Sequence, residues 1–297
     1  MKYTKQPIGI PEQLSTLKQR GLIFENEKVA QQTFESISYF RLANYWKIFE
    51  TDSVTHQLLE GTSLQDITSL YSFDRELRGI VFSAIQDIEI ALRTRIIHHF
   101  SMSHGAFWFM NPSLFIDESI YKKCLESLTN EVSRSKETFL QEHFQKYDEP
   151  TLPPVWKTLE VASFGTLSKL FCNMGDIPSK KKIAKSFGLP QYVYLESWLR
   201  SFTVLRNYCA HHARIWNRRF PWKPQLPKRL PLNWIDVSLT RPIKIFAQLS
   251  TLLYLEQSIS LNTPVKNQLL ALFAKQPPER MKAMGFPDNW NSHGLWR

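Results

Sequence analysis

The chain has 297 residues, of which 43% are hydrophobic and 22% charged, and a formal net charge of +10. This length and composition exclude collagen-like, disordered and disulfide-scaffold proteins and allow one large or two ordinary domains. The excess of 37 Lys and Arg over 27 Asp and Glu favours a phosphate-rich partner or an acidic membrane surface. The three cysteines, Cys124, Cys172 and Cys209, are widely separated and predict neither a disulfide framework nor a zinc site.

Apolar residues recur mostly at helical spacing, which predicts an all-α fold, a helical bundle with additional N- and C-terminal helices. We expect an N-terminal helical segment over residues 1–60, a helical core over 61–260, and a C-terminal helix with a tail over 261–297. No window approaches about 18 uninterrupted apolar residues, and no apolar segment follows the N-terminal charges. We therefore expect a cytoplasmic protein with no membrane partner.

The elements can be predicted in chain order. Residues 1–50 contain a helical stretch whose aromatic residues Tyr39, Phe40, Tyr45 and Trp46 are interpreted as packing residues. The strongest helix spans 64–100, where an apolar stripe follows the spacing Leu77, Val81, Ile85, Ile88, Leu92 and Ile96. Further helices are predicted over 117–149 (one or two), 155–173 with an interruption at 164–166, 179–185, 192–217, 241–260 and 264–275. Four prolines between 221 and 231 exclude a regular helix there, and the tail after 275 is predicted to be irregular.

The positive charge is concentrated in one part of the chain. From Ser197 to Ile235 there is no Asp or Glu, and this basic stretch contains Arg200, Arg206, Arg214, Arg218, Arg219, Lys223, Lys228 and Arg229. Unopposed arginines suit phosphate, so we interpret the stretch as a polyanion-binding surface rather than a solvated face. Trp216 and Trp222 lie among these cations and are each interpreted as packing residues, although either could stack on a base. Lys180, Lys181, Lys182 and Lys185 are either an extension of this surface or a solvated basic helix.

A helical wheel over residues 205–218 gives the two histidines of the basic stretch different environments. On this wheel one apolar stripe holds Leu205, Cys209, His212 and Trp216, and another face holds Asn207, His211, Arg214 and Arg218. The wheel predicts that His212 packs inward, and that His211 is the chemically active histidine, with its ring oriented by Asn207 one turn earlier.

A histidine among arginines suits phosphodiester cleavage. An imidazole with an ordinary pKa of about 6.5 moves protons near neutrality, and arginine stabilises the extra charge of a pentacoordinate phosphate. No acidic metal cluster accompanies these residues in the sequence, which predicts a metal-independent reaction without a cofactor. RNA is the favoured substrate because its 2′-hydroxyl can be the nucleophile.

The run Arg206-Asn207-Tyr208-Cys209-Ala210-His211 resembles the HEPN ribonuclease motif, in which Arg precedes His by four to six intervening positions. The longer string RNYCAHHARIWNRRF is similar to the signature of the Abi-like family of bacterial abortive-infection proteins, the AbiD/AbiF group. Other blocks agree with that family in order: SYFRLANYW at 38–46, FDRELR at 73–78, IEIALRTRI at 88–96, PPVWKTLEVASFGTLSKLF at 153–171 and GFPDNW at 285–290.

This resemblance implies a HEPN-type helical bundle that acts in phage defence by cleaving RNA. HEPN nucleases generally need two facing motifs, so a homodimer with a composite site is implied. Arg206 and His211 take the catalytic roles and Asn207 a polar supporting role, although His212 also falls within the motif's spacing. The RNA-binding residues are then Arg214, Arg218, Arg219, Lys223, Lys228 and Arg229. An inhibitory or regulatory RNA or protein bound along 197–235 is a further expectation, because an unrestrained ribonuclease is toxic.

Two other functions remain open. A catalytically inactive RNA-binding defence protein would use the same arginines, with His211 only donating a hydrogen bond to the RNA. A toxin paired with a nucleotidyltransferase antitoxin is less favoured, because Ala213 stands where that group has Tyr. His98, His99 and His104 lack Cys, Asp or Glu at ligand spacing, so no metal site is predicted there.

Glu89 and Arg93 are one turn apart on the strongest predicted helix. Glu89 lies about 40° from the apolar stripe, so we expect it to be partly buried and paired with Arg93. A sharper hypothesis is that Glu89 also holds Arg206 in place across a pair of packed helices.

Overall fold

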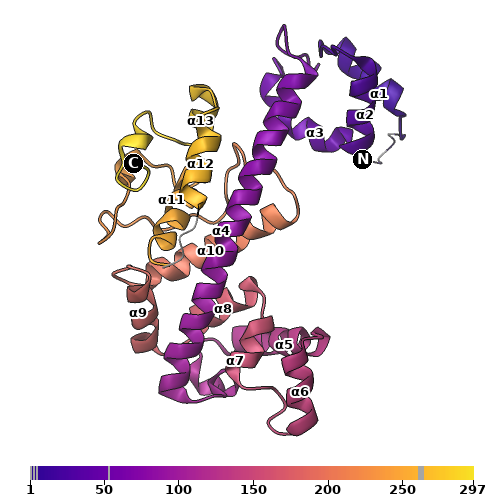
Figure 1. Cartoon of the computed structure of the whole chain (residues 1–297). Coiled ribbons are helices and arrows are strands. Elements are labelled where there is room, and N and C mark those ends of the chain that lie inside the picture. Colours follow the sequence, from indigo (N-terminus) through magenta and orange to yellow (C-terminus); the bar gives the residue numbers. More distant parts are fainter. Residues whose placement is uncertain (1, 3, 5, 53, 260–263) are drawn as a thin grey trace. The chain divides into compact units, whose positions relative to one another are not determined.

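The computed structural model describes residues 2, 4, 6–52, 54–259 and 264–297. Within them the regular structure consists of thirteen α-helices and six short 3-10 helices, with isolated bridges but no β-sheet (Figure 1). The predicted all-α fold is therefore confirmed. The chain divides into two compact units, Met1–Leu77 and Arg78–Arg297. The division into three segments stays a prediction, and its boundary between 260 and 261 lies outside the described residues.

The first unit contains α1 (Ile10–Gln19), α2 (Glu27–Ser36), α3 (Tyr39–Trp46), the 3-10 turn η1 (Lys47–Phe49) and the first part of α4 (Leu64–His104). Polar side chains start two of these helices, since Asn26 accepts a hydrogen bond from the Val29 N–H and Ser38 from the Arg41 N–H. Three short helices therefore replace the single helical stretch expected here.

The aromatic residues of α3 divide into two groups. Tyr45 and Trp46 are buried, and the Tyr45 hydroxyl donates a hydrogen bond of 2.7 Å to the Asp74 carboxylate on α4. Phe40 is 83% exposed, so its interpretation as a packing residue is wrong. Phe40 and Tyr39 are adjacent on the helix, and adjacent side chains point about 100° apart. Phe40 therefore faces away when Tyr39 faces its packing neighbours.

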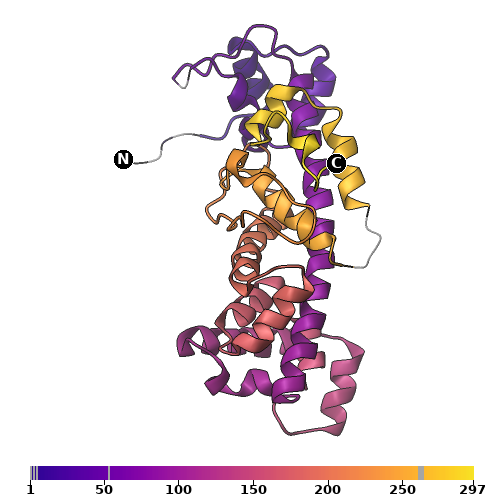
Figure 2. The same ribbon diagram turned by 90° about the vertical axis from the view of Figure 1, so that its left-hand side faces the viewer.

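Helix α4 is the longest element, with 41 residues. It starts with a capping box in which the Ser63 hydroxyl accepts from the Asp66 N–H and the Asp66 carboxylate accepts from the Ser63 N–H. The part of α4 that belongs to the second unit, from Arg78 on, is a single continuous helix (Figure 2). Its apolar stripe is confirmed, because Val81, Ile85, Ile88, Leu92 and Ile96 are all fully buried. Each contributes about 1.5–3 kcal/mol by leaving water.

The second unit continues with a helical layer around α8. Its elements are η2 (Trp108–Met110), η3 (Pro112–Leu114), α5 (Glu118–Arg134), α6 (Thr138–Lys146), α7 (Val155–Thr158), η4 (Leu159–Val161), α8 (Phe164–Asn173), α9 (Ile177–Ser186) and α10 (Tyr192–Ala210). Helix α8 packs against both α5 and α10 (Figure 1). The interruption predicted at 164–166 occurs earlier, at Ala162 and Ser163, because the Ser163 hydroxyl accepts from the Thr166 N–H and starts α8.

Lys180 on α9 differs from its neighbouring lysines. Its side chain is only 1% exposed, forms an ion pair with Glu196 on α10, and donates to the carbonyls of Cys172 and Met174 at 3.1 Å each. Lys180 is therefore part of neither an RNA-binding surface nor a solvated basic face, and both interpretations from the sequence are wrong for this residue. Lys181, Lys182 and Lys185 are exposed.

The C-terminal part is built on α11 (Ile245–Glu256), in which every residue is buried. The remaining elements are η5 (Val237–Leu239), α12 (Val265–Phe273), α13 (Pro278–Ala283) and η6 (Trp290–Ser292). Helix α13 lies in the tail predicted to be irregular. Pro278 occupies its first position, where the missing N–H costs nothing, so the proline starts this helix.

Among the described residues, no helix is both long enough and apolar enough to span a lipid bilayer.

Candidate functional site

Helix α10 ends at Ala210, so the helix predicted over 192–217 is too long by seven residues. The His212 N–H donates to the Cys209 carbonyl at 3.1 Å and the Ala213 N–H to the Tyr208 carbonyl at 2.8 Å. His212 has a φ of 55°, in the left-handed region. These are the hydrogen bonds and the backbone of a Schellman motif, which ends a helix and reverses the chain.

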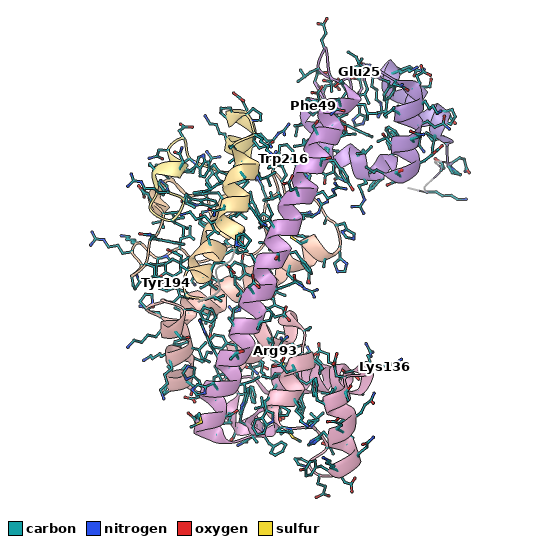
Figure 3. The ribbon with its side chains drawn as sticks, viewed as in Figure 1. Glu25, Phe49, Arg93, Lys136, Tyr194 and Trp216 are labelled. Carbon is teal, nitrogen blue, oxygen red and sulfur yellow. The ribbon has the colours of Figure 1, made fainter. Side chains whose placement is uncertain are left out.

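The apolar periodicity could not reveal this end. Trp216 is buried, as the wheel requires, but it reaches the core from the turn that follows the helix (Figure 3). The face that joined Asn207 and His211 to Arg214 and Arg218 does not exist as a helical face. The wheel prediction that His212 packs inward is also wrong, since His212 is exposed.

His211 and Asn207 lie together at the exposed end of α10. His211 is the residue that follows the last helical position, and its backbone N–H donates to the Asn207 carbonyl at 3.0 Å. Both side chains are exposed. Exposure therefore does not separate His211 from His212, but the backbone does, because only His212 takes the left-handed conformation that aims its side chain away from the helical path.

Arg206 lies on the side of α10 that faces α4. Its guanidinium carbon is 5.7 Å from the centre of the Phe82 ring, and the side chain is half-buried. Burial raises the pKa of the Glu89 carboxyl, and the positive charges of Arg93 and Arg206 oppose that rise. The packing of α10 on α4 thus brings Arg206 within electrostatic reach of Glu89.

The predicted Glu89–Arg93 ion pair is present, with 2.9 Å between the Arg93 guanidinium and the Glu89 carboxylate. Arg93 lies on α4 (Figure 3), is 9% exposed, and donates a second hydrogen bond of 3.0 Å to the Ala162 carbonyl. Glu160 lies 3.9 Å from the same guanidinium. Arg93 therefore fixes the segment before α8 against α4 and holds Glu89 beside Arg206.

Glu131 on α5 is a member of this cluster that the sequence analysis missed. It accepts a hydrogen bond of 3.0 Å from the Thr166 hydroxyl, and its negative charge adds to the rise in the Glu89 pKa. Its second carboxylate oxygen is buried without a hydrogen-bond partner. The sequence could have indicated that Glu131 is partly buried, because it is adjacent to Val132 on a helix whose buried side includes Leu128.

Replacing Glu89 by glutamine should reduce RNA cleavage without unfolding the protein, because glutamine keeps the shape and hydrogen bonding of the side chain but removes the charge near Arg206. Since burial raises the folded-state pKa of Glu89 above its ordinary 4.5, the wild-type carboxyl stabilises the fold at low pH and loses that contribution as pH rises. The free energy of unfolding of the wild type relative to Glu89→Gln should therefore fall as pH rises above about 4.5. Denaturant unfolding across this range measures it, and an unchanged cleavage rate would refute the positioning role.

The cations that follow α10 lie near two residues, Tyr208 and Lys244. The Arg218 guanidinium carbon lies 4.0 Å from the centre of the Tyr208 ring, and Arg218 donates to the Arg214 carbonyl at 2.7 Å. Lys244 donates to the Asn217 side chain at 2.7 Å and to the Ala283 carbonyl at 2.8 Å. Burial first, and then the charges of Arg219, Arg241 and Arg214, lower the pKa of Lys244.

The basic surface therefore extends beyond the stretch identified in the sequence. Arg241 and Lys244 follow Asp236, outside the acid-free residues 197–235, and the fold returns them to Arg214 and Arg219. At the other end, Arg200 is paired with Glu196 at 3.7 Å and is not unopposed.

The proline-containing segment after Phe220 is anchored to the helices beneath it. The indole N–H of Trp198 donates to the Gln225 carbonyl at 2.7 Å, and Ser201 and Gln248 both donate to the Trp222 carbonyl. This backbone is therefore fixed, and its exposed side chains include Trp222, Lys223, Lys228 and Arg229. Trp216 is a packing residue as interpreted, whereas Trp222 is 55% exposed and that interpretation is wrong for it.

The histidines near the end of α4 make contacts of their own, with each other and with Asp176. His98 and His99 contact each other edge to face, and His104 pairs with Asp176 at 2.8 Å. No group of three or more His, Cys, Asp or Glu side chains that could hold a metal ion occurs in the described part of the chain.

The structure thus separates the predicted site residues into three sets. Arg206 faces Glu89 and Arg93 of α4, Asn207 and His211 are exposed at the end of α10, and the remaining cations lie on the chain that follows: Arg214, Arg218, Arg219, Lys223, Lys228 and Arg229. Within the described residues, no side-chain hydrogen bond joins Arg206 to His211.

Comparison with known proteins identifies the chain independently of this geometry. No significant match was found among curated proteins or solved structures. The family model described as Abi-like protein matches residues 32–217, which is more than half of the chain. The matched region runs from α2 through the Glu89–Arg93 pair and ends just after the Arg206 to His211 motif, while the GFPDNW block at 285–290 lies outside it. The chain therefore belongs to the Abi-like protein family.

Proposed function

We propose that the protein is a HEPN-type endoribonuclease that acts in abortive infection and cleaves RNA without a metal ion at a site shared by two chains. Membership of the Abi-like family supports a role in phage defence. The observation that carries the nuclease proposal is the exposed His211 at the end of α10, five positions after Arg206 and next to a surface rich in arginine.

The reaction consists of two proton transfers and one displacement at phosphorus. A His211 imidazole removes the proton of a ribose 2′-hydroxyl, and that oxygen attacks the adjacent phosphorus. The bond from phosphorus to the 5′-oxygen breaks, and the leaving oxygen receives a proton from a second imidazole. The products are a 2′,3′-cyclic phosphate and a 5′-hydroxyl, and Arg206 stabilises the charge of the pentacoordinate intermediate.

The geometry of one chain favours a dimeric site. Five helical positions correspond to about 7.5 Å along the axis and about 140° around it, so Arg206 and His211 of one chain point in different directions. A second chain supplies the second imidazole for the leaving group, and two α10 ends placed face to face would enclose one phosphodiester between two copies of the motif. The cations Arg214, Arg218 and Arg219 would then hold the flanking phosphates.

The test is incubation of the purified protein with end-labelled single-stranded RNA in the presence of EDTA. We expect cleavage products that end in a 2′,3′-cyclic phosphate, and no cleavage of an RNA in which the 2′-hydroxyls are replaced by hydrogen. Retention of intact RNA would refute the nuclease and leave the catalytically inactive RNA-binding protein as the function. A chain that stays monomeric at concentrations at which it cleaves would refute the shared site.

A further inference from the structure

Two adjoining cavities lie in the C-terminal part of the second unit. One, of about 260 Å³, is lined by the aromatic residues Phe273, Phe286 and Trp290 together with Lys282 and Asp288. The other, of about 390 Å³, is lined by Arg241, Lys282, Asp288 and Asn289 among others. The cavities share Lys282, Phe286, Pro287 and Asp288, so they adjoin along this wall, and together they are called the depression, with an aromatic end and a cationic end.

The shared wall of the depression is the GFPDNW block at 285–290, to which the proposed catalytic site assigns no role. Gly285 has a φ of 90°, and a Cβ atom there would lie 2.5 Å from the Cβ of Lys244. Only glycine allows the backbone to approach Lys244 this closely. Lys244 in turn donates to the Ala283 carbonyl at 2.8 Å, so this wall is held against the start of α11.

The aromatic end presents a ring that can accept a stacking partner. Trp290 contacts Phe273, Phe286 and Trp296 at interplanar angles of 85–88°, with centroids 5.1–6.0 Å away. These edge-to-face contacts fix the half-buried indole from several sides. Among the described residues, no ring stacks parallel to Trp290, which lines the cavity.

The cationic end continues the basic surface that surrounds Lys244. Arg241 and Lys282 are both exposed at the cavity, and Arg214 and Arg219 lie close enough to Lys244 to lower its pKa. A bound group at this end therefore meets several positive charges and one carboxylate, Asp288. Phosphate suits the cations, and a ribose hydroxyl can donate to the carboxylate.

We propose that this depression binds one nucleotide of a single-stranded RNA, with the base stacked on Trp290 and its phosphate held by Arg241 and Lys282. Stacking on an aromatic ring beside a cationic groove is how sequence-tolerant proteins bind single strands. This inference rests on the proposed function, in which RNA is the substrate. It assigns the RNA a second binding site besides the proposed catalytic site. Arg214 and Arg219 lie near Lys244, between the end of α10 and this depression, so the proposed path of the RNA runs from His211 along the basic surface to the GFPDNW block.

The experiment uses the full chain with His211→Ala, so that the RNA is not consumed, and measures binding of a labelled oligoadenylate by fluorescence anisotropy at several salt concentrations. Adding Lys282→Glu should weaken binding about tenfold and reduce the salt dependence by about one phosphate contact. The matched control is Lys275→Glu, the same charge change at an exposed lysine that lines neither cavity. It should change binding less than about twofold.

A second measurement, the quenching of tryptophan emission, tests whether the base stacks on Trp290. Trp290→Phe keeps an aromatic ring in the same packing, and it should remove most of the quenching of tryptophan emission that oligoadenylate causes. Equal weakening by Lys282→Glu and Lys275→Glu, or unchanged quenching in Trp290→Phe, would overturn the site. If the wild type cleaves RNA while these variants bind normally, only this inference fails. If the protein with His211→Ala binds no oligonucleotide and the wild type cleaves none, the proposed function fails with it.

Discussion

Replacing His211 by asparagine should lower kcat/KM for RNA cleavage at least about 100-fold, the usual contribution of a positioned general acid or base. The same replacement at His212 should change it less than about threefold. Asparagine tolerates the left-handed backbone that His212 adopts at a φ of 55°, so the helix end is preserved. His211 lies in the bridge region, at φ −91° and ψ 13°, which asparagine also accepts. The two variants therefore differ in which imidazole is removed and not in the local fold.

This pair of variants decides a question that the motif leaves open, because both histidines fall within its spacing. Initial cleavage rates over a range of RNA concentrations give kcat/KM, and thermal unfolding shows whether both variants are folded. If His212→Asn abolishes cleavage and His211→Asn does not, the catalytic role belongs to His212. If neither changes the rate, the proposed reaction does not occur at this motif.

Replacing Arg206 by alanine should lower kcat/KM by about 100- to 1,000-fold, the loss typical of removing one group that stabilises charge in the transition state. Arg206→Lys should recover part of the rate, because it restores the positive charge but not the planar fork that contacts two phosphate oxygens. Arg134→Ala is the matched control, since Arg134 is exposed in the last turn of α5 and touches none of the proposed site residues.

Arg206 also acts on Glu89, which gives a second measurement. Its positive charge opposes the rise in the Glu89 pKa, so Arg206→Ala should let that pKa rise further and Arg206→Lys should not. The free energy of unfolding of Arg206→Ala, relative to the wild type, should therefore fall more steeply with increasing pH above about 4.5. Loss of cleavage with no change in this pH dependence would show that Arg206 does not depend on Glu89. Full activity of the folded Arg206→Ala protein would refute the catalytic assignment itself.

Local sequence was sufficient for most helices because their determinants are local. The stripe from Val81 to Ile96 identifies the buried side of α4, and prolines after Phe220 exclude a helix there. The Glu89–Arg93 pair is one turn apart on that helix, so its spacing alone predicts the contact. The motif from Arg206 to His211 and the family could also be recognised without the structure.

Other features depend on residues that are distant in the sequence. The partners of Lys180 are Glu196 and two carbonyls at the C-terminal end of α8, and nothing in a run of lysines indicates which one is buried. Glu131 reaches Glu89 only because α5 packs on α8. The cluster around Lys244 joins residues from before and after Asp236.

The sequence by itself determined the helical class, the family, the buried stripe of α4 and the identity of the candidate catalytic residues. The tertiary structure decided where α10 ends, that His212 is exposed, and that the basic surface continues to Arg241 and Lys244. The physical reason is that apolar periodicity records which side chains are buried but not the backbone path that buries them. Trp216 would be buried whether the helix continued to residue 217 or ended at Ala210. Only the tertiary structure shows that the chain reverses at His212 before Trp216 enters the core.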